Sequence, residues 1–307
     1  MTTIDRAALV RARWRTPDGI AEAWSARRPG ALPTDGRLLL IAADHPARGA
    51  LGVREAGMTM ADRVDLLTRI ATALTRPGVD GVLATPDVLE DLLLLGLLEG
   101  RILFGSMNRG GLQGASFEVD DRFTAYDAAT IAAHGLDGGK MLTRIALDDP
   151  ATAPTLQACG AAVTDLAARG RYAMVEPFLS DRGADGRVRN LLDPDSVIRS
   201  IHIASGLGAT SARTILKLPV VSDMARVLDA TTLPTLLLGG DPGPDPAATR
   251  AGWRSALAHP CAVGLVVGRA LLFPQGDDVA GAVDAAAELV IHQLGARGYP
   301  PQGLVEH

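Results

Sequence analysis

The sequence contains few lysine, cysteine and aromatic residues. Of its 30 basic residues only Lys140 and Lys217 are lysines, and aromatic residues make up 4% of the 307 positions. The two cysteines, Cys159 and Cys261, lie far apart and belong to no CxxC or Cys/His pattern. The cysteine count and spacing therefore exclude a disulfide framework and a structural zinc site.

Long hydrophobic runs are also missing. The most apolar stretch, residues 92–98, is too short for a membrane span, and the N-terminal residues lack the apolar core of a signal peptide. The formal net charge is −5, with no cluster of basic residues. Nucleic-acid binding would need such a cluster on one face. We therefore expect a cytoplasmic protein that binds neither membranes nor nucleic acid.

Short apolar runs recur along the chain, and each is followed by a segment with helical spacing. Uninterrupted apolar strands are typical of a parallel sheet that is covered on both faces. Eight such strands alternating with helices predict a (β/α)8 TIM barrel. An open doubly wound sheet is the alternative, but no GxGxxG follows the first run. The runs are residues 38–43, 81–85, 102–106, 140–147, 172–178, 214–221, 235–239 and 263–268.

The segments outside these strands complete the predicted organisation. Residues 1–37 are expected to form a short helical N-terminal extension, and residues 38–307 the catalytic barrel domain. The extension offers a surface for assembly into a homo-oligomer. The connection 107–127 is the least helical, and loops of this length are uncommon unless they are functional. We interpret it as a lid or a substrate loop.

Both lysines fall on predicted strands rather than on surface helices. Lysine can lose its proton and attack a carbonyl group, whereas arginine cannot, because its pKa lies above about 12. A lysine inside a barrel must pair with a carboxylate or be held neutral by burial and neighbouring positive charge. In a chain that uses arginine for its other cations, this placement favours a chemical role for Lys140 and Lys217.

Further polar residues lie within or directly after the predicted strands, and barrel active sites form at the carboxyl ends of strands. Asp44 and His45 follow the first strand, and Glu176 lies in the fifth. Arg144 shares a face of the fourth strand with Lys140. Positive neighbours would favour a neutral amine, while Asp44 and Glu176 would balance the charge. The alternative is a buried ion-pair network, such as Lys140 with Glu176, that serves only the fold.

Glycines end the last two predicted strands. Gly239 and Gly240 follow the seventh strand, and Gly268 and Arg269 follow the eighth. Glycine lets backbone N–H groups approach an oxyanion, and barrels often bind phosphate in the loops after these two strands. Arg269 would add a charge-assisted contact. We therefore predict a phosphate-binding site here.

In their order along the strands, these segments resemble the class I (Schiff-base) aldolases, which include deoxyribose-phosphate, archaeal-type fructose-bisphosphate, tagatose-bisphosphate and sulfofructose-phosphate aldolases. AADHPARG is similar to the first-strand segment of that family, GGKML to the fourth, AMVEPF to the fifth and TILKLP to the sixth. GGDP and VVGRALLF resemble its phosphate grip. The resemblance covers residues 38–273.

The resemblance implies that Lys217 forms the imine and that Lys140 tunes the ionisation of that amine. Glu176 would be the acid/base, and Asp44 would orient substrate hydroxyls or aid proton transfer. The implied activity is that of an aldehyde-lyase without metal or cofactor, acting on a phosphorylated sugar or sugar acid in carbohydrate or inositol catabolism. Arg144 stands where the archaeal-type enzymes have a tyrosine, which favours the tagatose-bisphosphate-like arrangement.

Alternatives to this aldolase remain open. A metal-dependent aldolase would need several histidines at strand ends, and of the six histidines only His45 is placed there. Another imine-based transfer, of transaldolase, synthase or thiolase type, would use the same residues. A non-catalytic phosphosugar-binding protein would need no pair of buried amines, so Lys140 and Lys217 argue against it.

Overall fold

The computed structural model describes residues 4–33, 37–240, 242–243 and 245–292. Residues 1–3 and 34–36 of the expected extension lie outside the described residues. The same holds for residues 293–307 of the expected barrel domain.

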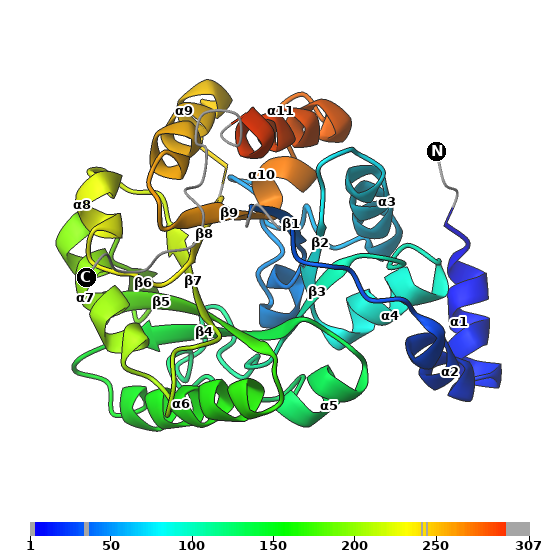
Figure 1. Ribbon diagram of the computed structural model, residues 1–307, viewed down its shortest axis with the longest axis horizontal. Helices are drawn as coiled ribbons and strands as arrows, with labels where there is room; N and C mark the ends of the chain where they lie inside the picture. The colour runs from blue at the N-terminus through cyan, green and yellow to red at the C-terminus, as the bar shows by residue number, and fades with distance from the viewer. Residues whose placement is uncertain (1–3, 34–36, 241, 244, 293–307) are drawn as a thin grey trace, which may run out of the picture.

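Eight parallel strands close into a barrel in the order β1-β2-β3-β4-β5-β7-β8-β9, with β9 pairing back to β1 (Figure 1). The predicted TIM barrel is confirmed, and each of the eight predicted runs overlaps one of its strands. A ninth strand, β6, was not predicted. The strands are β1 (Leu38–Ala42), β2 (Gly81–Ala84), β3 (Ile102–Ser106), β4 (Gly138–Ile145), β5 (Tyr172–Arg182), β6 (Val188–Asn190), β7 (Thr214–Pro219), β8 (Thr235–Leu238) and β9 (Ala262–Val267).

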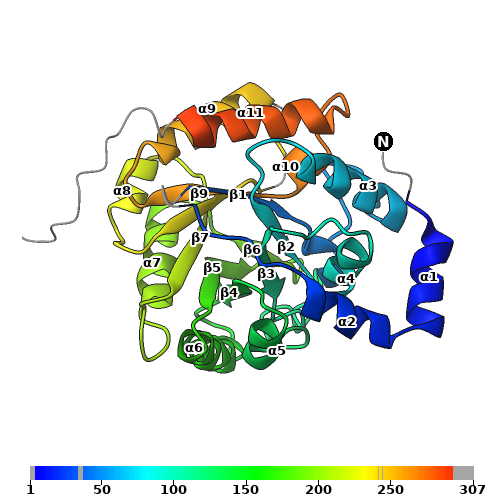
Figure 2. The ribbon, with the colours of Figure 1, turned by 45° about the vertical axis from the view of Figure 1, so that its right-hand side comes forward.

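Helices surround the barrel, while α1 and α2 lie beside α4 at its margin (Figure 2). Within the described residues, every helix is too short or too polar to cross a membrane. The helices are α1 (Arg6–Arg15), α2 (Asp18–Ala26), a 3-10 helix (His45–Arg48), α3 (Arg63–Leu74), α4 (Pro86–Leu94), α5 (Ala128–Ala133), α6 (Thr152–Ala168), α7 (Pro194–Ser205), α8 (Met224–Leu228), α9 (Pro246–Leu257), α10 (Arg269–Leu272) and α11 (Val279–His292).

Alternate residues of the strands pack in two separate cores, which explains the continuous apolar runs. On β1, Leu38 and Leu40 pack inside the barrel, whereas Leu39 and Ile41 pack against the surrounding helices. The inner core is an apolar layer contributed by several strands. It also contains Leu83, Phe104, Met174, Ile215, Leu236 and Val266.

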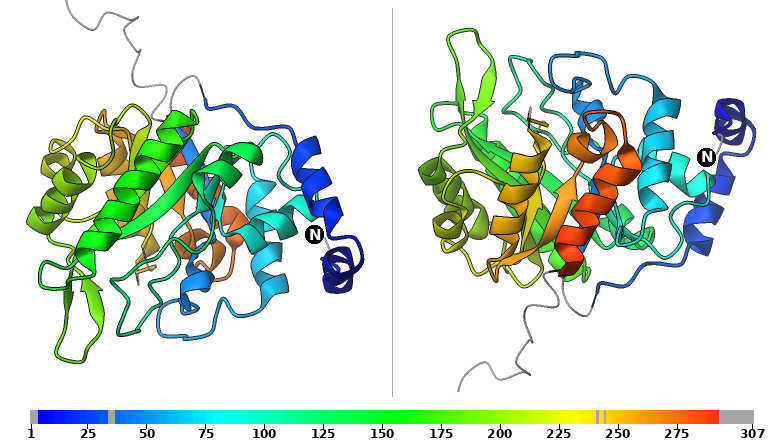
Figure 3. Two further views of the ribbon diagram at one scale, coloured as in Figure 1. Left: turned by 90° about the horizontal axis from the view of Figure 1, so that it is seen from below. Right: turned by 90° about the horizontal axis from the view of Figure 1, so that it is seen from above.

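The unpredicted strand β6 forms a hairpin with the end of β5. Ser180 pairs with Asn190, and Arg182 pairs with Val188. The hairpin projects beyond the barrel at the carboxyl ends of the strands (Figure 3). Arg182 also donates a hydrogen bond of 3.0 Å to the main-chain oxygen of Ser116. The hairpin is thereby attached to the 107–127 loop.

Candidate active site

A large cavity of about 740 Å³ opens at the carboxyl ends of the barrel strands. All ten candidate residues named from the sequence line this cavity. The structure therefore brings together side chains from β1, β4, β5 and β7 with the ends of β8 and β9. The ten residues are Asp44, His45, Lys140, Arg144, Glu176, Lys217, Gly239, Gly240, Gly268 and Arg269.

Strand register explains why three of these side chains meet. On β5 and β7, Met174 and Ile215 are register neighbours inside the barrel. The next inward positions toward the carboxyl end are Glu176 and Lys217. On β4, Lys140 is level with Met174, one inward position nearer the amino end. The long side chain of Lys140 thus approaches Glu176 from the apolar layer.

Glu176 joins the two lysines in the cavity. Its Oε1 accepts a hydrogen bond of 2.8 Å from Lys217 Nζ, and its Oε2 forms an ion pair with Lys140 Nζ. Lys140 Nζ also donates to Asp44 Oδ2 at 3.0 Å. Each of the four side chains is at most 10% exposed. Together they form a continuous buried chain of alternating charges.

Burial and neighbouring charge act in opposite directions on these groups. Burial alone raises the pKa of Glu176, but the charges of Lys140 and Lys217 lower it to about 2. Burial lowers the pKa of Lys140, which stays below its ordinary value although Asp44 and Glu176 raise it. At neutral pH, Glu176 is therefore a carboxylate, and Lys140 releases its proton more readily than a free lysine does.

Asp44 is held by Arg109, a residue that the sequence analysis did not name. Arg109 Nη1 donates to Asp44 Oδ2 and to Ser106 Oγ, both at 3.1 Å, and Nη2 donates to the main-chain oxygen of Asp44. Burial alone raises the pKa of Asp44. The charges of Lys140 and Arg109 outweigh burial and hold that pKa well below its ordinary value. Asp44 is therefore ionised as well.

His45 lies beside this chain as a neutral imidazole. Burial lowers the pKa of His45 to about 3, although the Asp44 carboxylate opposes this. His45 Nδ1 lies 3.8 Å from Asp44 Oδ1, which is too far for a hydrogen bond. The side chain is 25% exposed. His45 can therefore offer an uncharged hydrogen-bonding group to a molecule in the cavity.

The glycines at the ends of β8 and β9 are required by close packing or by backbone conformation. A Cβ atom on Gly268 would lie 2.4 Å from the main-chain oxygen of Ala42, and one on Gly239 would lie 2.5 Å from Val267 Cγ1. Gly240 has a φ of +63°, a left-handed conformation that favours glycine. These positions thus need glycine for packing and backbone geometry, independently of any ligand.

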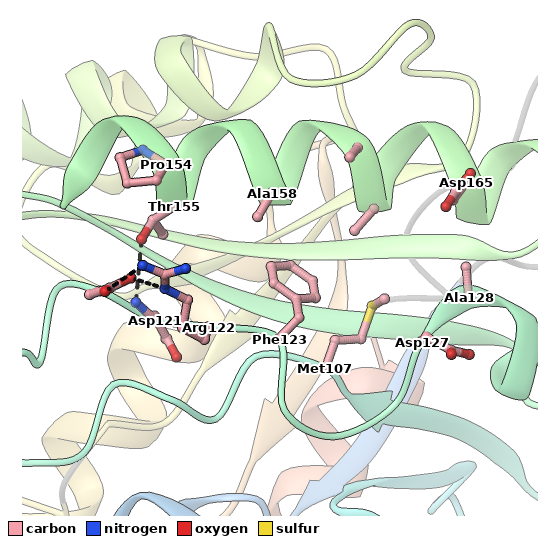
Figure 4. A pocket seen from close by; sticks show the side chains of 13 residues that line it. Met107, Asp121, Arg122, Phe123, Asp127, Ala128, Pro154, Thr155, Ala158 and Asp165 are labelled. Atoms are coloured by element: carbon pink, nitrogen blue, oxygen red, sulfur yellow. Dashed lines mark hydrogen bonds and ion pairs between the residues drawn. The ribbon is translucent and has the colours of Figure 1, made fainter.

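The 107–127 loop contributes residues to the wall of the cavity and is packed against the barrel. Asn108 is fully buried, and its side chain donates to the oxygen of Leu142 and accepts from its nitrogen. On the side facing α6, Met107 and Phe123 line a second cavity of about 320 Å³ (Figure 4). The loop therefore lies between α6 on one side and the larger cavity on the other.

Charged side chains of this loop pair with arginines at the cavity. Glu118 pairs with Arg144 at 2.9 Å, and Asp121 pairs with Arg48 at 2.6 Å. Among the described residues, Arg144 Nη1 has no hydrogen-bond partner, so it can donate to a bound molecule. The sequence did not indicate Arg48, Glu118 and Asp121 as site residues. The sequence shows only that the long loop contains charged residues, which does not indicate their ion-pair partners.

The cavity is cationic although the whole chain carries a net charge of −5. Among the described residues that line it, six are arginine or lysine and three are aspartate or glutamate. A cleft lined by an excess of one charge attracts molecules of the opposite charge. The cavity is therefore suited to an anionic small molecule.

The cavity does not offer the ligand set of a metal site. In the described ranges, no three histidine, cysteine, aspartate or glutamate residues are grouped so that they could hold a metal ion. Asp44 and Glu176 instead contact the amine of Lys140. The arrangement is that of amine and carboxylate chemistry.

Comparisons with known proteins identify one similar family. The family model described as Cgl0159-like matches residues 36–287. The crystal structure of Cgl0159 from Corynebacterium glutamicum (Brevibacterium flavum) is 53% identical in sequence, covers 93% of this chain and 96% of that chain, and superposes with a TM-score of 0.90. No curated protein matches the sequence.

Two solved aldolases share the fold at low sequence identity. An archaeal fructose-1,6-bisphosphate aldolase, with its catalytic lysine covalently bound to the carbinolamine intermediate, is 19% identical over 88% of this chain and 99% of that chain, with a TM-score of 0.61. A fructose-bisphosphate aldolase from Slackia heliotrinireducens DSM 20476 is 14% identical over 99% and 97%, with a TM-score of 0.57. These likenesses show the fold alone.

Proposed function

The chain belongs to the Cgl0159-like family, and from the chemistry of its cavity we propose that it is a class I aldolase. In this proposal Lys217 forms a Schiff base with a phosphorylated ketose or keto sugar acid, and the enzyme cleaves that compound reversibly. The proposal makes the protein an aldehyde-lyase that needs no metal or cofactor.

One observation carries the proposal: the only two lysines of the chain share one buried carboxylate, that of Glu176. Binding a sugar phosphate does not require two buried amines. An ion-pair network that served only the fold would be a weak source of stability, because burying its charges costs free energy. Imine chemistry uses both amines and explains the site at the carboxyl ends of the strands.

The reaction would begin with attack of the neutral Lys217 amine on the substrate ketone. The new C–N bond forms while the carbonyl oxygen takes up a proton, giving a carbinolamine. Loss of water then gives a protonated imine, which withdraws electrons from the bond between its α and β carbons. An archaeal aldolase of the same fold has been seen with its catalytic lysine in the carbinolamine form.

Cleavage would follow when a base removes the proton of the hydroxyl group two carbons from the imine carbon. The carbon–carbon bond breaks, its electron pair forms the enamine, and the hydroxyl carbon leaves as an aldehyde. We assign this proton transfer to Glu176, directly or through a water. Imine formation removes N–H donors from Lys217, which frees Oε1 of Glu176 for the substrate. Protonation of the enamine and addition of water then release the second product.

The cavity supports an anionic substrate with polar groups at both ends. Gly239, Gly240, Gly268 and Arg269 would bind the phosphate, and this remote contact would hold the ketone against Lys217. Arg144 and the neutral His45, which lies beside Gly268, would bind hydroxyl or carboxylate oxygens, and Asp44 would orient a hydroxyl group. The presence of all these residues in the lining of one cavity supports these assignments.

Borohydride trapping tests the proposal directly. The protein is incubated with a panel of ketose phosphates and sodium borohydride, and adducts are located by intact-mass and peptide mass spectrometry. Because the chain has only two lysines, a reduced adduct can be assigned to one residue. We expect it on Lys217, with the mass of the retained carbonyl fragment.

A folded protein that forms no adduct with any substrate, yet binds sugar phosphates tightly, would replace the proposal with a binding protein. An adduct on Lys140 alone would reverse the roles of the two amines. Product analysis with and without an added aldehyde acceptor separates aldol cleavage from a transaldolase-type transfer. Free aldehyde released without an acceptor is expected for the aldolase.

A further inference from the structure

Arg109 extends from the 107–127 loop into the buried chain of charges. Its side chain is 6% exposed, and its guanidinium contacts both the carboxylate and the main-chain oxygen of Asp44. The loop around Arg109 is fixed by the buried side chain of Asn108. The guanidinium is thus a permanent and well-positioned positive charge beside the amines.

The charges of the inner cluster do not balance when both amines are protonated. Asp44 and Glu176 supply two negative charges, while Arg109 and the two lysines would supply three positive charges. Arginine keeps its charge at any ordinary pH. The cluster is therefore neutral only when one of the two amines has lost its proton.

Among the described residues around the cluster, the other charged pairs and the imidazole do not supply the missing negative charge. Two arginines near it are each paired with one carboxylate, and the imidazole is neutral. These groups are the pairs Arg48–Asp121 at 2.6 Å and Arg144–Glu118 at 2.9 Å, and the imidazole of His45.

We propose that Arg109 is a positioning residue that keeps one amine of the lysine pair unprotonated near neutral pH. Arg109 shares the Asp44 carboxylate with Lys140, so two carboxylates face one guanidinium and two amines. Without Arg109, the two carboxylates would match two ammonium groups, and no nucleophile would remain. The inference rests on the proposed function, because only an imine-forming site needs a free amine before substrate binds.

Lysine-selective isotope labelling tests this inference on the full chain without substrate. Only two lysine signals are expected, and their chemical shifts report the protonation of each amine as the pH is varied. In the wild type, we expect one proton to leave the pair below neutral pH. In Arg109→Gln, the pH at the midpoint of this deprotonation should rise by about 1 to 3 pH units, which is the usual effect of removing a nearby charge.

A charge-balanced set of variants separates this role from a merely structural one. Asp44→Asn removes a negative charge, so it increases the excess of positive charge in the cluster and should lower the midpoint. The double variant D44N/R109Q has the same excess of positive charge as the wild type, so its midpoint should return to the wild-type value. Damage to the structure would instead accumulate in the double variant. Arg122→Gln, which changes an exposed arginine of the same loop, is the matched control and should leave the midpoint unchanged.

Two results would overturn the inference. One is an unchanged midpoint in a folded Arg109→Gln protein; the other is a double variant that fails to return toward the wild type. If Arg109→Gln does not fold, the comparison of D44N/R109Q with Asp44→Asn still decides, since the inference requires a higher midpoint in the double variant. Borohydride trapping is a separate measurement, so loss of the proposed function and loss of this inference are distinguishable.

Discussion

Lys217 donates a hydrogen bond of 2.8 Å from Nζ to Oε1 of Glu176, deep within the barrel mouth. The second oxygen of the same carboxylate contacts Lys140. One buried carboxylate therefore serves two amines, so loss of Glu176 removes the carboxylate that Lys217 contacts and one of the two that Lys140 contacts. Such losses are costly in a buried site, which makes the cluster sensitive to single substitutions.

Lys217→Arg should abolish turnover although it preserves the positive charge. The guanidinium cannot lose its proton to become a nucleophile, so we expect a loss on the order of 10³-fold or more. Steady-state assays with the ketose phosphate that gives the trapped adduct provide the measurement. Thermal unfolding of the same preparation controls for folding. Retention of a substantial part of the wild-type rate would refute the assignment of Lys217.

Glu176→Gln should reduce kcat by about 10²- to 10⁴-fold, because an amide cannot accept the hydroxyl proton. It should also destabilise the fold by about 3 to 5 kcal/mol at neutral pH, as breaking a buried ion pair does. Denaturant unfolding and steady-state kinetics measure the two effects. A variant with normal kcat would transfer the role of base to another group.

The same variant should differ from the wild type in its response to acid. The pKa of Glu176 is about 2 in the folded protein, below the value of about 4.3 expected when unfolded. The stabilisation from its carboxylate is therefore complete above the unfolded pKa and disappears as the pH falls toward 2. We expect the gap in unfolding free energy between wild type and Glu176→Gln to narrow over this range. A gap that does not depend on pH would show that Glu176 gains no stability from being ionised.

The barrel and much of its site were predictable because both depend on local periodicity. Continuous apolar runs specify strands buried on both faces, and a period of two places Glu176 and Lys217 on the inward face. The strand order then brings their carboxyl ends together. The sequence therefore predicts which of these side chains meet, although it does not give their contacts.

Arg109 and the β5–β6 hairpin were not predictable in the same way. A loop has no period, and its path is set by tertiary contacts such as those of Asn108 with Leu142. The run through β5 indicated one strand, but not its extension to pair with β6. Arg109, which sets the charge balance of the cluster, thus comes from a segment with weak local signal.

His45→Asn should weaken the pH dependence of stability in mild acid. The pKa of His45 is about 3 in the folded protein and about 6.5 in an unfolded chain, so the unfolded state binds a proton first. Wild-type stability should therefore fall as the pH drops from 6.5 toward 3, and the variant should fall less steeply. Unfolding free energies across this range provide the measurement. His202→Asn, on the exposed face of α7, is the control and should keep the wild-type slope.

Chelation should leave the activity unchanged. The described residues provide no group of metal ligands, and the two cavity carboxylates are engaged by amines. After dialysis against EDTA, we expect the protein to cleave the ketose phosphate that gives the trapped adduct at an unchanged rate. Activity that disappears with EDTA and returns with a divalent cation would instead support a metal-dependent aldolase.

Arg269→Gln should discriminate between phosphorylated and unphosphorylated substrates. A hydrogen bond to a charged group contributes about 1.5 to 3 kcal/mol, so we expect KM for the ketose phosphate to rise about 10- to 100-fold. For the unphosphorylated ketose, kcat/KM should change little, since the lost contact is absent from that complex. Arg122→Gln, which changes an exposed arginine paired with Asp120, should affect neither substrate. Equal losses on both substrates would move the phosphate site away from α10 and indicate that Arg269 supports the cavity itself.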